Sequence, residues 1–214
     1  MRDAASRVAG LHLVTDSALC GARGVEAVVL AAVRGGARVV QLREKELATR
    51  AFVERARALK ALLAPLGVPL VINDRLDVAL ACAADGLHVG QDDLAPQDVR
   101  RWMPNALLGL SIERLDQLDA AERLPVDYYG AGPVFATPTK PDAAAPMGLD
   151  GLRLLRAGTA RPLVAIGGIT ETNAAAVIAA GAQGLAVVSA LCAAPDPEAA
   201  ARRLCAAMDI APTR

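Results

Sequence analysis

The sequence lacks any hydrophobic run long enough to cross a membrane, and no apolar stretch follows the charges at its start. A membrane span and a secretory signal both need such a run, so we expect neither. Net charge is also absent, because 23 basic residues balance 23 acidic ones. A balanced charge gives no overall attraction to nucleic acid or to an anionic membrane. We therefore expect a cytoplasmic protein that binds neither, and any bound anion must be held by a local cluster.

Cysteine is scarce and widely spaced. This spacing has neither the density of a disulfide scaffold nor the pairing of a zinc site. We expect small buried hydrophobic residues at Cys20, Cys82, Cys192 and Cys205.

Lysine is rarer still, because only Lys45, Lys60 and Lys140 are lysine among the 23 basic residues. In a chain this rich in arginine, a lysine can mark a place that needs a compact ammonium group rather than a planar guanidinium. Lys60 lies in the middle of a predicted helix, where a solvated surface explains it.

What the chain does have is a repeated pattern of short apolar runs, each followed by an alanine-rich segment with helical spacing. Such a pattern predicts βα units. The predicted strands are residues 11–15, 38–42, 69–72, 86–89, 107–110, 127–130, 163–166 and 184–187. The predicted helices are residues 25–34, 49–64, 76–82, 96–102, 113–123, 149–157, 171–180 and 197–208.

Eight strictly alternating units favour a closed parallel barrel, since each parallel connection needs a crossover helix. An open doubly wound sheet is the alternative, but it normally has a glycine-rich phosphate loop after its first strand, where this chain has Thr15-Asp16-Ser17. We predict one (β/α)₈ barrel domain over residues 1–214, with frayed ends at 1–9 and 210–214. In such a barrel the active site lies at the carboxyl ends of the strands.

The end of the second strand combines cations with an amide. Strand alternation points Gln41, Arg43 and Lys45 to one side and Leu42 to the other. These three side chains would face the mouth of the barrel. The alternative is a charged surface turn.

Carboxylates follow the third and fourth strands. Asp74 and Asp93 would converge at the edge of the sheet, and Mg²⁺ prefers a few such oxygen ligands together with phosphate oxygens. A magnesium and diphosphate site is the simplest interpretation. The alternative makes each aspartate a helix N-cap.

Hydroxyl groups and glycines follow the last three strands. Thr137, Thr139 and Lys140 form a potential anion clamp in a proline-ordered loop. The pair Gly167-Gly168 and the hydroxyl of Ser189 end the seventh and eighth strands, which is where barrels of this kind often bind phosphate.

The two histidines, His12 and His88, fall inside predicted strands, so we expect packed or hydrogen-bonded core residues. No catalytic triad can be assembled, and no general base is evident. This combination suits departure of a diphosphate better than proton abstraction.

Taken in order, several segments resemble the signatures of the thiamine-phosphate synthase family over nearly the whole chain. These segments are Gln41-Leu42-Arg43-Glu44-Lys45, Asn73-Asp74-Arg75, His88-Val89-Gly90-Gln91-Asp92-Asp93, Leu108-Gly109-Leu110-Ser111, Thr137-Pro138-Thr139-Lys140, Gly167-Gly168-Ile169 and Val188-Ser189.

The resemblance implies a (β/α)₈ transferase that joins 4-amino-2-methyl-5-hydroxymethylpyrimidine diphosphate to 4-methyl-5-hydroxyethylthiazole phosphate, by a dissociative reaction with Mg²⁺. Small-molecule substrates are the partners that it implies, and a homo-oligomer is possible. By resemblance, the metal ligands are Asp74 and Asp93, and the cations that stabilise the leaving group are the catalytic Arg43, Lys45 and Lys140. The residues that bind the pyrimidine diphosphate are Gln41, Arg43, Lys45, Asn73, Ser111, Thr137, Thr139 and Lys140, and those that bind the thiazole phosphate are Gly168, Val188 and Ser189.

One segment departs from the family pattern, because Ile112-Glu113-Arg114 follows Ser111 where a small residue is expected. This departure concerns the wall near the pyrimidine. Three other functions compete. They are a thiazole tautomerase-like barrel, a non-catalytic barrel that binds thiamine phosphates, and a Schiff-base aldolase using Lys45 or Lys140. The retained diphosphate residues argue against the first two, and the absence of an apolar strand around either lysine argues against the third.

Overall fold

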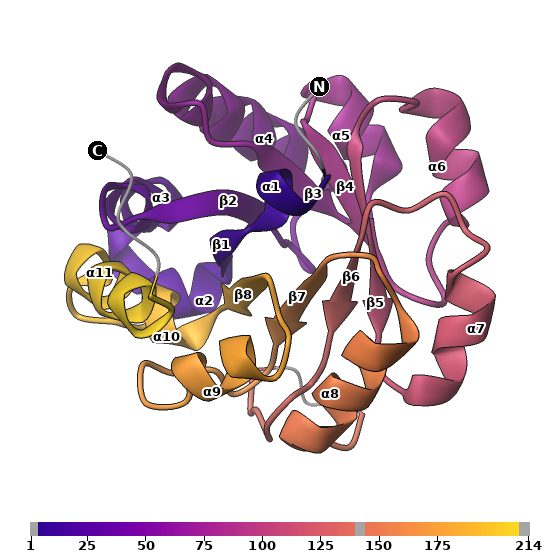
Figure 1. Cartoon of the computed structure of the whole chain (residues 1–214). Coiled ribbons are helices and arrows are strands. Elements are labelled where there is room, and N and C mark those ends of the chain that lie inside the picture. Colours follow the sequence, from indigo (N-terminus) through magenta and orange to yellow (C-terminus); the bar gives the residue numbers. More distant parts are fainter. Residues whose placement is uncertain (1–3, 140–143, 210–214) are drawn as a thin grey trace.

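The computed structural model describes residues 4–139 and 144–209. Eight parallel strands pair in sequence order and close where β8 meets β1, with helices around the outside (Figure 1). The predicted (β/α)₈ barrel is therefore confirmed. Its strands are β1 (Gly10–Val14), β2 (Ala37–Leu42), β3 (Leu70–Asn73), β4 (Gly86–Val89), β5 (Leu107–Ile112), β6 (Tyr128–Ala131), β7 (Leu163–Ile166) and β8 (Gly184–Val187).

The helices follow the strands, with short additional helices near the barrel ends. They are α1 (Ala4–Val8), α2 (Ser17–Cys20), α3 (Val25–Arg34), α4 (Thr49–Leu63), α5 (Leu76–Ala81), α6 (Pro96–Trp102), α7 (Leu118–Ala121), α8 (Gly148–Gly158), α9 (Ala174–Ala179), α10 (Ser189–Cys192) and α11 (Pro197–Ala207). Three 3₁₀ turns complete the set: η1 (Gly21–Arg23), η2 (Ala64–Leu66) and η3 (Leu115–Gln117).

The single helix predicted for residues 113–123 was wrong. The Gln117 side chain accepts hydrogen bonds from the backbone N–H groups of Glu113 (2.8 Å) and Arg114 (3.1 Å). These bonds satisfy backbone donors outside a helix, which is how a polar side chain competes with helical bonding. The segment therefore forms the turn η3 before the short helix α7.

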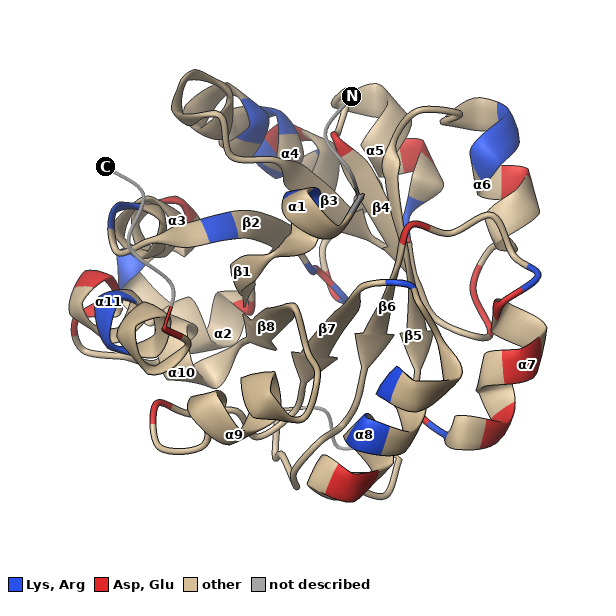
Figure 2. Cartoon of the chain, viewed as in Figure 1, with Lys and Arg blue, Asp and Glu red and all other residues tan. Residues whose placement is uncertain are grey.

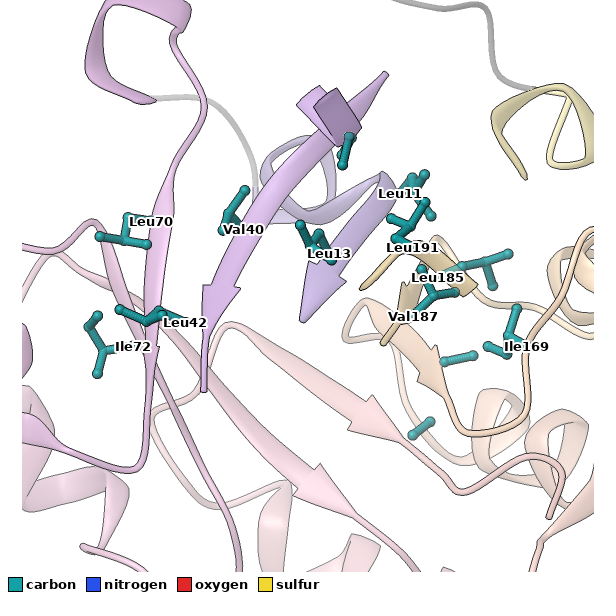
Figure 3. Close-up of a cluster of buried hydrophobic side chains, with 14 of the residues drawn as sticks. Leu11, Leu13, Val40, Leu42, Leu70, Ile72, Ile169, Leu185, Val187 and Leu191 are labelled. Carbon is teal, nitrogen blue, oxygen red and sulfur yellow. The ribbon is translucent and has the colours of Figure 1, made fainter. Parts of the chain in front are cut away.

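Side chains alternate between two cores along every strand. Outward residues such as Leu11, Leu13, Val40 and Leu42 pack between the sheet and the helices (Figure 3). Inward residues form a second, smaller cluster inside the barrel: Val8, Val14, Val39, Val71, Leu107, Tyr128, Val164 and Ala186. A barrel of this kind is thus filled with side chains at its base and leaves room only near its mouth.

Charge lies almost entirely on the helices and loops (Figure 2). Among the strand residues only Arg38 is charged. Within residues 4–139 and 144–209, no helix combines the length and the apolar character that a membrane crossing requires. All four cysteines are buried and free, as the sequence predicts.

The amino-terminal end of the barrel is covered by α1, which lies opposite the strand arrowheads in Figure 1. Val8 is fully buried in the inner cluster, and its carbonyl oxygen lies 2.8 Å from Nε2 of His12. This contact attaches α1 to β1. The frayed ends expected at residues 1–9 and 210–214 stay a prediction.

Lys60 is not the solvated surface residue that the sequence indicates, so that interpretation was wrong. Its Nζ lies 2.6 Å from Oδ1 of Asp85, whose Oδ2 accepts the Leu70 N–H at 2.8 Å. Asp127 repeats this arrangement at the next pair of strands, accepting from Leu108 N–H at 2.8 Å and pairing with Arg100 at 2.6 Å.

Both aspartates have the same place in the fold. Asp85 precedes β4 and accepts a hydrogen bond at the start of β3, and Asp127 precedes β6 and does the same at the start of β5. A buried strand end leaves a backbone N–H that needs an acceptor. The ion pairs therefore stabilise the end of the barrel that is remote from the strand carboxyl ends.

Candidate functional site

A cavity of about 690 Å³ opens at the carboxyl ends of the strands. Every predicted site residue that the structure describes lines this cavity: Gln41, Arg43, Lys45, Asn73, Asp74, Asp93, Ser111, Thr137, Thr139, Gly168, Val188 and Ser189. Lys140 lies outside the described residues. The structure thus brings together residues from seven strand ends, β2 to β8, that are far apart in sequence.

Strand alternation accounts for much of this convergence. Gln41 comes two residues after the inward-facing Val39, and Asn73 comes two residues after Val71. Ser111 is likewise an even number of residues after the inward-facing Leu107. Residues an even distance apart face the same side of a strand, so the polar residues form the layer above the apolar base.

Asp74 lies at the apex of a tight turn after β3. Its φ of 62° is left-handed, and the N–H of Arg75 donates across it to the Asn73 carbonyl at 2.7 Å. A non-glycine residue held there is strained, which is common where geometry serves a function. The carboxyl group does not cap α5, whose N-cap is Arg75. For Asp74 the N-cap alternative is therefore wrong.

Asp93 approaches from the loop after β4. Its Oδ2 accepts the Gly90 N–H at 2.7 Å, while α6 is capped by Ala95, so Asp93 is not an N-cap either. Burial raises the pKa of Asp74, the hydrogen bond from Lys45 lowers it, and the nearby Asp93 raises it again. A carboxyl group whose pKa is raised by burial and by a neighbouring carboxylate favours a bound cation beside it.

The donor set fits Mg²⁺ bound together with a phosphate-containing ligand. Among the described residues, no group of three His, Cys, Asp or Glu side chains could hold a metal ion. Mg²⁺ is commonly bound by one or two carboxylates, with waters and substrate phosphates completing its six ligands. Asp74 and Asp93 match that pattern, and they do not match an all-protein cage.

Two cations stand beside the carboxylates. Nζ of Lys45 lies 2.5 Å from Oδ2 of Asp74, and the lysine side chain is 53% exposed. The backbone N–H of Arg43 donates to Oγ1 of the buried Thr15 at 3.0 Å. Within the described part of the chain, no carboxylate pairs with the Arg43 guanidinium. Its charge is available to an anion in the cavity.

A polar network beneath Ser111 was not found from the sequence. Nε2 of His88 lies 2.9 Å from Oγ of Ser111, and Nδ1 lies 3.0 Å from the Tyr128 hydroxyl. Burial lowers the pKa of His88 to about 4 and raises that of Tyr128. The ring is therefore neutral near pH 7 and has both nitrogens engaged.

The sequence carried one signal of this network. A Cβ at Gly109 would meet Nδ1 of His88 at 2.3 Å, and a Cβ at Gly130 would meet its Cε1 at 2.7 Å. The two glycines on neighbouring strands make room for the imidazole inside the barrel. As the sequence predicts, His88 is a hydrogen-bonded core residue, but it also forms part of the cavity wall.

The opposite side of the cavity is built from glycine and hydroxyl groups. Gly167 and Gly168 follow β7 with φ values of 98° and 63°, which glycine adopts without penalty. Ser189 begins α10, a short helix that the sequence analysis did not predict. The first amides of a helix have no intrahelical acceptor, so they are available to an anion.

The loop after β6 is fastened to the end of β7. Val134 N–H donates to the Ile166 carbonyl at 2.9 Å, and Phe135 N–H donates to the Gly167 carbonyl at 3.0 Å. The two threonines of the predicted anion clamp are hydrogen-bonded to each other, since Thr139 N–H donates to the Thr137 hydroxyl at 3.3 Å. The loop that carries both threonines is therefore attached to the end of β7, at the edge of the cavity.

Comparison with known proteins agrees with the family resemblance over most of the chain. The family model described as thiamine monophosphate synthase matches residues 11–191. The chain belongs to this family. It is 57% identical over 195 residues to thiamine-phosphate synthase of Albidiferax ferrireducens, covering 91% of this chain and 89% of the relative. It is 62% identical over 195 residues to thiamine-phosphate synthase of Solidesulfovibrio magneticus, covering 91% and 92%.

A solved structure of the thiamine monophosphate synthase family has the same fold. Thiamine phosphate pyrophosphorylase from Pyrococcus furiosus is 36% identical and superposes with a TM-score of 0.86, covering 94% of this chain and 95% of that chain.

The departure from the family pattern after Ser111 has little effect on the cavity. Ile112 points outward into the helix-facing core and is fully buried there. Glu113 lines the cavity, so the difference reaches the wall only through this one side chain.

Proposed function

We propose that this chain joins 4-amino-2-methyl-5-hydroxymethylpyrimidine diphosphate to 4-methyl-5-hydroxyethylthiazole phosphate, giving thiamine phosphate and pyrophosphate. The observation that carries the proposal is a cavity with two unlike halves. Cations and carboxylates follow β2, β3 and β4, and glycine and hydroxyl groups follow β7 and β8. In a closed eight-stranded barrel β3 and β7 lie opposite each other. Two phosphorylated substrates can therefore bind facing each other.

The diphosphate would bind on the first half. Asp74 and Asp93 would hold Mg²⁺, which neutralises charge on the departing pyrophosphate when bound. Arg43 and Lys45 stand beside them and stabilise the same charge. The predicted roles of Thr137, Thr139 and Lys140 in completing this half also belong to the proposal.

The pyrimidine ring would meet the inward-facing amides and hydroxyl of Gln41, Asn73 and Ser111. Ser111 has its orientation set by His88, which lies 2.9 Å away. Hydrogen bonds from fixed groups orient a polar ring without adding charge. These contacts place the pyrimidine methylene between the two halves of the cavity.

The thiazole phosphate would bind across the cavity, at Gly168, Val188 and Ser189. Its ring nitrogen already carries a lone pair, so attack on the pyrimidine methylene needs no proton removal. Burial lowers the pKa of both His12 and His88 to about 4, and His88 has both ring nitrogens engaged. The site is thus suited to a dissociative reaction, in which pyrophosphate leaves before the thiazole attacks.

The competing functions fit the cavity less well. A tautomerase or a non-catalytic thiamine-phosphate barrel would leave the two carboxylates and the cavity-facing Arg43 without a role. A Schiff-base mechanism on Lys45 conflicts with its ion pair to Asp74 at 2.5 Å.

The proposal is tested by mixing both phosphates with Mg²⁺ and measuring thiamine phosphate and pyrophosphate. Asp74→Asn and Asp93→Asn are the informative variants, because asparagine keeps the size of the side chain and tolerates the left-handed backbone at position 74. We expect turnover to fall by more than about 100-fold in each, while thiazole phosphate still binds. Undiminished turnover in both variants, or in chelator, would contradict the metal assignment. Binding without turnover in the wild type would favour the non-catalytic barrel.

A cytoplasmic location and a homo-oligomeric assembly stay predictions from the sequence.

A further inference from the structure

Glu44 lies between two cavity residues but does not line the cavity. Its neighbours Arg43 and Lys45 both face the cavity, whereas the Glu44 side chain turns away and is only 5% exposed. A nearly buried carboxylate is costly unless it is paired and hydrogen-bonded. The position of Glu44 therefore needs an explanation beyond a surface turn.

The contacts of Glu44 join three separate elements. Its Oε1 accepts from the Ser17 hydroxyl of α2 at 2.6 Å and from Nη1 of Arg55 on α4 at 2.6 Å. Arg55 also donates to the Ser17 hydroxyl at 2.8 Å. The three side chains close a triangle of hydrogen bonds. It ties the loop after β2 to the helices on both sides of it.

The same loop is fastened a second time at its first residue. The Arg43 N–H donates to Oγ1 of the fully buried Thr15 at 3.0 Å. Arg43 is thus held by the end of β1, and Glu44 is held by α2 and α4. The backbone has little freedom where the two cavity cations leave it.

We propose that Glu44 is a positioning residue, which acts through Ser17 and Arg55 to hold Arg43 and Lys45 ready for the diphosphate. The inference rests on the proposed function, since it assigns the diphosphate to this loop. Two cations two residues apart repel each other before an anion arrives, and a mobile loop would let them separate. A fixed backbone removes that freedom, so less ordering is needed when the anion binds.

The chain provides a matched control on the same helix. Lys60 of α4 pairs with Asp85 at 2.6 Å, the distance that separates Arg55 from Glu44. The Arg55 and Lys60 side chains are 28% and 27% exposed. Asp85 caps the start of β3, however, at the other end of the barrel from the cavity. Loss of either ion pair should lower the stability of the fold. Only loss of the pair between Arg55 and Glu44 should also disturb the positions of Arg43 and Lys45.

The experiment compares Glu44→Gln and Asp85→Asn in the full chain, using Mg²⁺ with inorganic pyrophosphate as the binding probe in calorimetry. We expect Glu44→Gln to weaken pyrophosphate binding about tenfold and to lower kcat/KM for the pyrimidine diphosphate by a similar factor. The KM for thiazole phosphate should change less than about twofold, because its site lies across the barrel. Asp85→Asn should lower the melting temperature and leave both substrates unaffected.

Equal pyrophosphate binding by Glu44→Gln and the wild type would overturn the inference, as would an equal loss for both substrates. If Glu44→Gln does not fold, Ser17→Ala decides, because it removes the hydroxyl that donates to Glu44 and accepts from Nη1 of Arg55, while the ion pair between Arg55 and Glu44 stays. The same selective loss is then expected, and wild-type pyrophosphate binding would overturn the inference. A wild-type protein that binds pyrophosphate but forms no thiamine phosphate would contradict the proposed function and leave this comparison valid.

Discussion

Residues of the same type have different roles in this barrel. Lys45 and Lys60 are both lysines in an arginine-rich chain, yet one faces the cavity and the other pairs with Asp85 at the far end. At the equivalent place beside Asp127 the chain uses Arg100. Arginine is therefore compatible with the remote ion pair. Lys45 differs in its partner, because Asp74 also accepts from Nδ2 of Asn73 at 2.6 Å and faces the cavity.

This difference predicts the effect of exchanging one cation for another. We expect Lys60→Arg to retain wild-type kinetics and Lys45→Arg to lose about tenfold in kcat/KM, which corresponds to about 1.4 kcal/mol of transition-state stabilisation. The cause is the broad guanidinium, which does not fit where a compact ammonium meets Asp74 and the phosphate oxygens. Lys140→Arg, outside the described residues, should behave like Lys45→Arg. Steady-state kinetics of the three variants checks this, and three wild-type rates would make the retained lysines incidental.

The loops after β6 and β7 contact each other through their backbones at the cavity. A Cβ at Gly168 would approach the Ala136 carbonyl oxygen and the Phe135 Cβ at 2.7 Å each. The loop after β6 carries Thr137, and the loop after β7 carries Gly168, where we propose that the thiazole phosphate binds. The two halves of the cavity are thus mechanically joined at this glycine, although their side chains are chemically separate.

We expect Gly168→Ala and Ser189→Ala to have distinguishable kinetic effects. The alanine at 168 would strain a backbone whose φ is 63° and displace residues 135–136, so KM should rise for both substrates. Ser189→Ala removes one hydroxyl at the site proposed for the thiazole phosphate, so only the KM for that substrate should rise, by about tenfold, as for a hydrogen bond to a charged group. Separate titrations of each substrate measure the two constants. Selective effects from both variants would contradict the contact between the loops.

The whole barrel encloses two imidazoles in an apolar interior. His12 bonds Val8 of α1 near the base, and His88 bonds Tyr128 and Ser111 nearer the mouth. Burial lowers the pKa of both rings to about 4. The unfolded chain binds protons at its ordinary histidine pKa, near 6.5, while the folded chain does not. Below that value the unfolded state takes up more protons, so stability falls as the pH falls.

The free energy of unfolding should therefore decrease between about pH 7 and about pH 5, by about 2 kcal/mol for each histidine. Urea unfolding at several pH values measures this slope. His12→Gln removes one titrating ring while keeping a donor for the Val8 carbonyl, so its slope should be smaller by that amount. A variant with the wild-type slope would show that His12 does not titrate in this range on unfolding.

The sequence by itself determined the closed parallel barrel, and each described residue of the site predicted from it lines the cavity. Strand alternation is local, so Gln41 could be assigned to the inner face from the sequence, whereas Asn73 and Ser111 were assigned to the site by the family resemblance. The βα repeat requires parallel strands and places their carboxyl ends together.

Only the tertiary structure decided the partners of these residues. The contacts of Ser111 with His88, of Glu44 with Ser17, and of Lys60 with Asp85 join residues 23, 27 and 25 positions apart. No periodicity connects such residues, because barrel closure and helix packing set their distances. The short helices α1 and α10 were missed for a related reason. Isolated helices of a few residues are unstable, and they form here through contacts with the barrel ends.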